Sequence, residues 1–178
     1  MIRFLCLAAL ALTTTARADV TSGPKVGDKL ENFKVFGVVG SIEGKEGSYV
    51  NDRKDEPAVY VFVQQAHWSR PMARFLKTLD TAAKEANDTV FVSAIWLTES
   101  PDKAKDYLPK AQTSLNFANT SLGVFEGEKS GPNNWGINAD AHLTVVVAHQ
   151  GKAVAVFAMD SVNETDVKKV VAEVKKVK

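Results

Sequence analysis

Long apolar runs alternate with amphipathic stretches through the middle of the chain. Residues 58–63 (Ala-Val-Tyr-Val-Phe-Val) and residues 89–97 are rich in apolar and β-branched side chains, a pattern typical of strands buried on both faces of a sheet. Between them, apolar positions recur at helical spacing, which predicts a helix that begins after Ser69 and ends near Asn87. The apolar positions of this helix are Met72, Phe75, Leu76, Leu79, Ala82, Ala83 and Ala86.

Shorter elements are expected on either side of this unit. Residues 33–39 have the pattern of a strand, and the Ser-Pro pair at 100–101 is typical of a helix start. We expect Pro109 to end or kink that helix, because proline lacks the N–H that a helix interior needs. Residues 115–118 fit a short strand. Residues 122–136 are rich in Gly, Asn and Pro and read mostly as loop.

The C-terminal third predicts a hairpin followed by a helix. Residues 143–148 and 153–159 are apolar strands separated by His-Gln-Gly-Lys, which favours a tight antiparallel turn. Asn163 is a suitable N-cap for a last helix. The apolar stripe of that helix is Val167, Val170, Val171, Val174 and Val177.

This order of elements predicts an α/β fold. A sheet that begins with parallel strands and ends with an antiparallel hairpin and a final helix gives a three-layer sandwich with a mixed sheet. The chain has 178 residues, 45% of them hydrophobic and 24% charged, which suits one globular domain and excludes a disordered chain. With 22 basic and 21 acidic residues there is no strong positive field, so nucleic acid is not expected as a partner.

The first 18 residues have the pattern of a signal peptide. Arg3 precedes an apolar run at 4–12, and the segment ends in Ala16-Arg17-Ala18, a small-x-small cleavage pattern. The run is shorter than the ~20 residues that span a bilayer, and we expect no transmembrane segment elsewhere. Cleavage near Ala18 would export the protein to the periplasm or the medium, whereas an uncleaved leader would act as an anchor.

Cleavage would also change the chemistry of the chain. Cys6 is the only cysteine, so removal of 1–18 leaves none. Residues 19–25 are polar and contain Gly and Pro, which predicts a flexible N-terminal tail. Residues 26–178 then form the folded domain.

Three segments in this order carry a resemblance to a known family. Residues 66–72, Ala-His-Trp-Ser-Arg-Pro-Met, lie between the predicted strand and the predicted helix and resemble the Ala-x-Trp-Cys-Gly-Pro-Cys motif of thioredoxin-like proteins. Residues 26–33 resemble the opening of the peroxiredoxin and envelope thiol-reductase branch, and Trp-Gly-Ile at 135–137 resembles the Tyr-Gly-Val stretch of that branch. The resemblance spans residues 26–178 and implies a thioredoxin-like fold.

The departures from that family concern its reactive atoms. The resemblance places Ser69 and Met72 where the two redox cysteines would stand, and His142 or Leu143 in the region of the family's cis-proline. Disulfide exchange needs a thiolate. A serine hydroxyl is not ionised near neutral pH without a neighbouring base, and a thioether has no proton to lose. The chain therefore resembles a degenerate redoxin without thiol redox activity.

A thioredoxin-like fold in which both redox cysteines are replaced favours a binding function over a catalytic one. We expect the former active-site edge to hold a protein or peptide partner in the cell envelope, with no bound cofactor. The candidate residues are His67, Trp68, Ser69, Arg70, Pro71, Met72, Trp135 and His142.

Two alternatives use the same residues. Imidazole and thioether ligands suit copper, so His67, Met72 and His142 are candidate metal ligands. Ser69 with a histidine is a candidate hydrolytic pair in a divergent enzyme, although no Gly-x-Ser-x-Gly motif surrounds it. The competing structural interpretation makes Ser69 a helix cap, Met72 and one or both tryptophans (Trp68 and Trp135) core residues, and the histidines surface groups.

Overall fold

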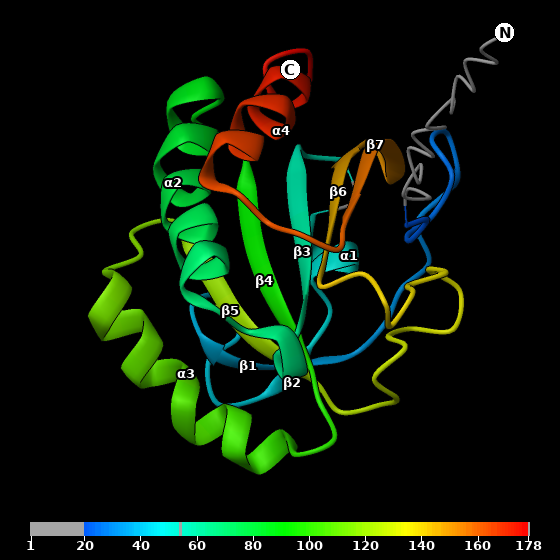
Figure 1. The fold of residues 1–178 in the computed structure, drawn as a ribbon. Helices are drawn as coiled ribbons and strands as arrows, with labels where there is room; N and C mark the ends of the chain where they lie inside the picture. Colours follow the sequence, from blue (N-terminus) through cyan, green and yellow to red (C-terminus); the bar gives the residue numbers. More distant parts are fainter. Residues whose placement is uncertain (1–19, 54, 178) are drawn as a thin grey trace, which may run out of the picture.

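A single mixed sheet lies at the centre of the computed structural model, which describes residues 20–53 and 55–177 (Figure 1). The strands are β1 Val35–Val39, β2 Glu46–Gly47, β3 Ala58–Gln64, β4 Phe91–Leu97, β5 Thr120–Phe125, β6 Leu143–His149 and β7 Lys152–Met159. In the described part of the chain their order across the sheet is β2-β1-β5-β4-β3-β6-β7. The predicted signal peptide at 1–18 lies outside the described residues.

The sheet combines parallel and antiparallel strands as the sequence predicts. β3 pairs with β4 in parallel, and β4 pairs with β5 in parallel. β6 is antiparallel to β3, and β7 is antiparallel to β6 across the tight turn. All seven residues of β3 are buried, because this strand lies inside the sheet and both of its faces are covered. The predicted α/β class, with a C-terminal hairpin and a final helix, is confirmed.

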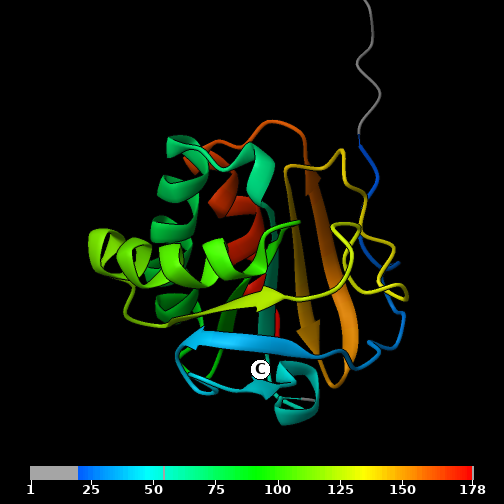
Figure 2. The same cartoon turned by 90° about the horizontal axis from the view of Figure 1, so that it is seen from below.

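The helices are distributed unequally between the two faces (Figure 2). The α-helices are α1 Tyr49–Asp52, α2 Arg70–Ala86, α3 Pro101–Leu115 and α4 Val167–Val174, and the 3-10 helices are η1 Gln65–His67 and η2 Glu164–Asp166. Helices α2, α3 and α4 cover one face, which we call the helical face. The other face is covered by α1 and by irregular segments around Leu30 and Trp135, and we call it the loop face.

Alternation along the strands divides the core between these two faces. In β3, Val59, Val61 and Val63 point to the helical face, while Tyr60 and Phe62 point to the loop face. The helical-face core is mostly aliphatic. The loop-face core is rich in aromatic rings.

One strand lies outside its predicted position. Residues 115–118 are not a strand: Leu115 ends α3, and Asn116 adopts a left-handed conformation that terminates the helix. β5 follows at Thr120–Phe125 and overlaps the start of residues 122–136, whose composition indicated loop. Gly123 suits this position, because a Cβ atom there would make a tight contact of 3.1 Å with the carbonyl oxygen of Phe36 on β1. The glycine that suggested a loop allows two strands to approach closely.

Helix α3 continues past its proline. Pro109 is exposed and removes one main-chain N–H from the helix. Its neighbours Leu108 and Ala111 are both buried, and Leu108 belongs to the helical-face core. Burial of this apolar side holds the helix together up to Leu115. The expectation that Pro109 ends the helix is therefore wrong.

The described part of the predicted tail, residues 20–25, is packed against the sheet. Ser22 is buried, and its hydroxyl lies 2.6 Å from that of Thr144 on β6. The N–H of Gly23 donates to the carbonyl of Gly136 at 3.0 Å. Gly23 has a positive φ of 96°, and a Cβ there would lie 2.7 Å from Val156, so only glycine fits this crossing. These contacts join residues 22 and 23 to β6, β7 and the loop at Gly136.

No helix among the described residues has both the length and the apolar character needed to cross a membrane.

Candidate functional site

The strand–turn–helix unit of the sequence motif forms at one edge of the sheet. β3 ends at Gln64, η1 makes one turn, and α2 begins at Arg70 with Ser69 as its N-cap. The segment before β6 lies beside it, since the N–H of Gln64 donates to the carbonyl of His142 at 3.1 Å. We call residues 66–72 together with His142 the helix-entry edge.

Trp68 is held firmly at this edge. Its ring is half-buried and packs against Trp96 of β4, with the ring centres 5.1 Å apart. Its indole Nε1 donates a 2.7 Å hydrogen bond to the hydroxyl of Tyr107 on α3, a residue that is 40% exposed. A fixed aromatic side chain loses little conformational entropy when a ligand packs against it. Tyr107 was missed by sequence reasoning, although an aromatic residue on a charged helix surface was a usable signal.

The two histidines of the helix-entry edge stack face to face. The rings of His67 and His142 lie 3.7 Å apart with an angle of 14° between their planes. The stack joins η1 to the segment before β6. In the register of β6 with β7, Leu143 lies opposite Met159, which places His142 opposite Asp160.

The two positions that replace redox cysteines differ sharply in exposure. Ser69 is exposed, and its side chain makes no capping hydrogen bond to the helix. Met72 is 1% exposed and packs in the helical-face core. Of this pair, only the Ser69 hydroxyl is available at the surface. Met72 is therefore a core residue and not part of an exposed binding surface.

Arg70 and Pro71 occupy the first two positions of α2 and are both exposed. Within the described residues, Arg70 makes no ion pair. Its guanidinium can therefore bind an incoming carboxylate or carbonyl without first breaking a contact.

Trp135 lies away from the helix-entry edge. It is 1% exposed and belongs to the loop-face core, whereas Trp68 packs against the helical-face core. Its indole donates a 2.9 Å hydrogen bond to the carbonyl of Glu31. An aromatic side chain that fills a core is not available to a partner. Trp135 therefore does not belong with the other predicted binding residues. No local sequence pattern indicates the face of the sheet on which Trp135 packs.

The alternatives based on metal or on hydrolysis find little support in this geometry. Imidazole lone pairs lie in the ring plane, so two parallel rings at 3.7 Å do not converge on one ion, and Met72 is enclosed in the core. Within the described residues, no group of three or more His, Cys, Asp or Glu side chains could hold a metal. In the same part of the chain, no hydrogen bond joins Ser69 to His67, whose ring stacks on His142.

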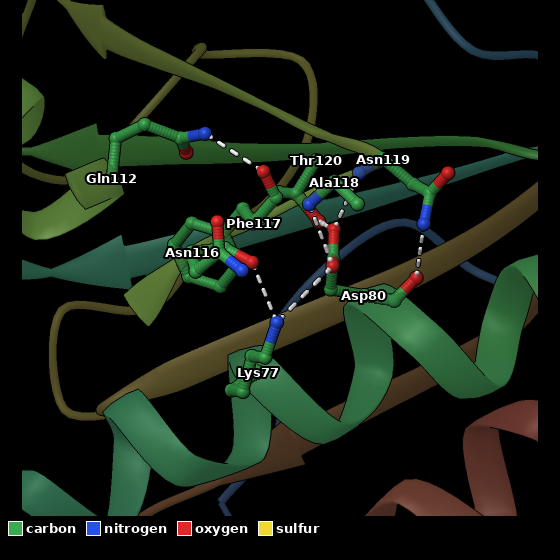
Figure 3. Close-up of polar contacts among 8 residues, drawn as sticks. All are labelled: Lys77, Asp80, Gln112, Asn116, Phe117, Ala118, Asn119 and Thr120. Atoms are coloured by element: carbon green, nitrogen blue, oxygen red, sulfur yellow. Dashed lines mark hydrogen bonds and ion pairs between the residues drawn. The ribbon is translucent and has the colours of Figure 1, made fainter. Parts of the chain in front are cut away.

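A second polar cluster, around Asp80, was not anticipated from the sequence (Figure 3). Asp80 is 0% exposed in the middle of α2. Its carboxylate accepts hydrogen bonds from the N–H groups of Ala118 and Asn119 at 2.9 and 2.8 Å, and from the Thr120 hydroxyl at 2.8 Å. Lys77 lies 3.9 Å from the carboxylate and donates to the Asn116 carbonyl at 2.6 Å. These contacts fix the connection between α3 and β5, which is a structural role.

Comparisons with known proteins define the fold of the chain. No family model matches it, and no curated protein sequence matches it. Among solved structures, a peroxiredoxin-like protein from Aquifex aeolicus matches with a TM-score of 0.62 and 17% identity, over 89% of this chain and 90% of that one. A secreted thiol-disulfide isomerase from Corynebacterium glutamicum matches with a TM-score of 0.62 and 14% identity, over 95% and 98% of the two chains.

A third match is BsSco, described as a member of the Sco family of cytochrome c oxidase assembly proteins with a disulfide switch. Its TM-score is 0.58 at 16% identity, over 89% of this chain and 100% of that one. At these identities the likeness shows the fold. The chain has the thioredoxin-like redoxin fold, and its described residues contain no cysteine, since Cys6 lies outside them.

Proposed function

We propose that this protein is an exported thioredoxin-fold binding module that holds an extended protein or peptide segment at the helix-entry edge without thiol chemistry. The observation that carries the proposal is the fixed ring of Trp68, followed two residues later by the exposed Arg70, which makes no ion pair among the described residues. A half-buried aromatic ring supplies apolar contact, and the guanidinium supplies a directed polar contact. Aromatic residues and arginine are the side chains most enriched where binding energy concentrates.

The replacement of both cysteine positions supports the non-catalytic part of the proposal. An exposed Ser69 and a core Met72 cannot form a mixed disulfide. A thiol-coupled insulin-reduction assay on the chain purified after export should therefore show no turnover above the dithiothreitol background. Turnover would contradict this part of the proposal.

The export part rests on the pattern of residues 1–18. Fractionation of the native cells followed by N-terminal sequencing should recover a chain that begins near Asp19 outside the cytoplasm. A chain that retains Met1 in the membrane fraction would instead make the leader an anchor.

The binding part is tested by affinity capture from the native envelope fraction. Partners recovered with the wild-type chain should be lost with a Trp68→Ala, Arg70→Ala double variant. They should be retained with Lys168→Ala, which removes an exposed cation from the first turn of α4. Identical partner sets from the wild-type chain and the double variant would refute binding at the helix-entry edge, provided that circular dichroism shows both proteins to be folded.

A further inference from the structure

A polar pocket of about 450 Å³ adjoins the helix-entry edge and shares Ala66 with it. Its lining residues come from the ends of β3 and β4, from η1 and from the turn between β4 and α3. The carboxyl ends of parallel strands are the usual ligand-binding side of an open α/β sheet, because the loops that leave them diverge there. We call it the β4–α3 pocket.

One wall of this pocket is a closed ion pair. Lys129 and Glu99 contact each other at 2.8 Å, and the Lys129 carbonyl accepts a 2.8 Å hydrogen bond from the side chain of Gln64. The hydrogen bond from Lys129, reinforced by its charge, lowers the pKa of Glu99, and the same contact raises the pKa of Lys129. Both groups are therefore charged at neutral pH and compensate each other.

The other wall carries a positive charge that the protein does not compensate. Lys103 is exposed in the first turn of α3, and within residues 20–53 and 55–177 it makes no ion pair. With the Lys129–Glu99 pair neutral overall, the charged side chains of the pocket sum to one positive charge. The carboxylate of one acidic residue would neutralise this charge.

Hydrogen-bonding groups beside Lys103 are also available. Ser100 is the N-cap of α3, but its side chain makes no capping hydrogen bond. Thr98 Oγ1 accepts from the Ser100 N–H at 2.9 Å, which leaves the Thr98 hydroxyl proton free to be donated. The pocket thus offers hydroxyl donors near its free cation.

We propose that the β4–α3 pocket receives an acidic side chain, Asp or Glu, of the peptide segment held at the helix-entry edge. This inference rests on the proposed function and adds the class of partner, which is an acidic segment. Its carboxylate binds Lys103 and the hydroxyls of Thr98 and Ser100, and the flanking main chain passes Ala66 toward Trp68. The pocket volume accommodates one such residue with its adjoining main chain.

Selection from a random 12-residue peptide library displayed on phage, with the full exported chain as bait, tests the partner class. We expect enrichment of Asp or Glu at one position in peptides that bind the wild-type chain. Selected peptides, synthesised with blocked termini, should lose affinity about tenfold when that residue is changed to Gln. Against the Lys103→Gln protein the same change should have no effect, as a coupled pair requires. Lys110→Gln, at another exposed position of α3, is the matched control and should behave as wild type.

The outcomes separate this inference from the proposed function. Selection of neutral peptides whose binding needs Trp68 and Arg70 but not Lys103 would support the helix-entry edge as a binding site. The same result would overturn the proposal that the β4–α3 pocket receives an acidic side chain. Selected peptides that keep their affinity when the enriched Asp or Glu is changed to Gln would overturn the assignment to a carboxylate side chain. Failure to select any peptide that depends on Trp68 or Arg70 would overturn the proposed function and the pocket with it.

Discussion

The two faces of the sheet are stabilised by different means. The helical face has amphipathic helices over an aliphatic core, with a single buried carboxylate, Asp80, holding the α3–β5 connection. The loop face is covered mostly by irregular chain over aromatic rings, among them Tyr49, Tyr60 and Trp135. Regular helices satisfy their own main-chain groups, whereas irregular chain depends on specific contacts. The loop face therefore depends on a few large side chains, and the candidate site lies at the sheet edge where the two coverings meet.

The largest effect on stability is expected from removing the Trp135 side chain from the loop-face core. Trp135 packs against Phe33, Tyr60 and Phe62 with ring centres 5.1–5.6 Å apart. Trp135→Ala should lower the free energy of unfolding by about 3–5 kcal/mol, because it leaves a cavity and an unpaired carbonyl at Glu31. Urea unfolding followed by circular dichroism measures this. A loss below about 1 kcal/mol would mean that the ring is not a core element.

A somewhat smaller effect is expected on the helical face. Asp80→Ala removes the acceptor for two main-chain N–H groups and one hydroxyl, and it should cost about 3 kcal/mol. Asp106→Ala, at an exposed position of α3, is the control and should change stability by less than about 0.5 kcal/mol. Equal effects of the two substitutions in urea unfolding would remove Asp80 as the anchor of this connection.

Alkaline pH should reduce the stability that the buried tyrosines of the loop face contribute to the protein. Burial, with a smaller contribution from Asp52, raises the pKa of Tyr49 to about 12, and burial also raises the pKa of Tyr60. The unfolded chain loses the Tyr49 proton near pH 10, before the folded chain does. The contribution of Tyr49 to stability is therefore complete below pH 10 and is lost as the pH rises to 12, by about 2–3 kcal/mol.

Tyr49→Phe sharpens this prediction. The Tyr49 hydroxyl has no hydrogen-bond partner within the described residues, so the variant should match wild type at pH 7. Near pH 11 it should be the more stable protein in urea unfolding. Parallel loss of stability in both proteins between pH 10 and 12 would show that Tyr49 is not responsible.

The smallest effect on stability is expected at the edge between the faces. Tyr107→Phe removes the hydrogen bond to Trp68 and should lower stability by about 1 kcal/mol or less, because both groups can be solvated. Its effect should appear instead in Trp68 mobility, measured as lower fluorescence anisotropy in a chain where Trp96 and Trp135 are replaced by Phe. Unchanged anisotropy would show that packing against the aromatic ring at position 96 alone holds Trp68.

The helical face was predictable from sequence because its elements have a strong period. The apolar positions from Met72 to Ala86 locate α2, and the β-branched runs locate β3 and β4. β5 was misplaced because Gly123 reads as a loop residue when the neighbouring strand is unknown. The covering of the loop face has no period at all, so the burial of Trp135 depends on contacts between residues far apart in the chain.

The candidate site was predictable in part. The motif at 66–72 placed Trp68, Ser69 and Arg70 at a helix start, as the structure has them. The stacking of His67 on His142, the contact of Trp68 with Tyr107, and the pocket beside Lys103 join segments separated by tens of residues. Such contacts arise from the packing of the sheet edge and leave no local pattern.

The most direct test of the binding edge is a map of amide chemical shifts on the isotopically labelled chain, titrated with a peptide selected on it. The largest changes should fall at residues 66–72, at His142 and at Tyr107, with smaller changes at Ser100 and Lys103. A map centred on α4 or on the outer edge of β7, with residues 66–72 unchanged, would contradict the proposal.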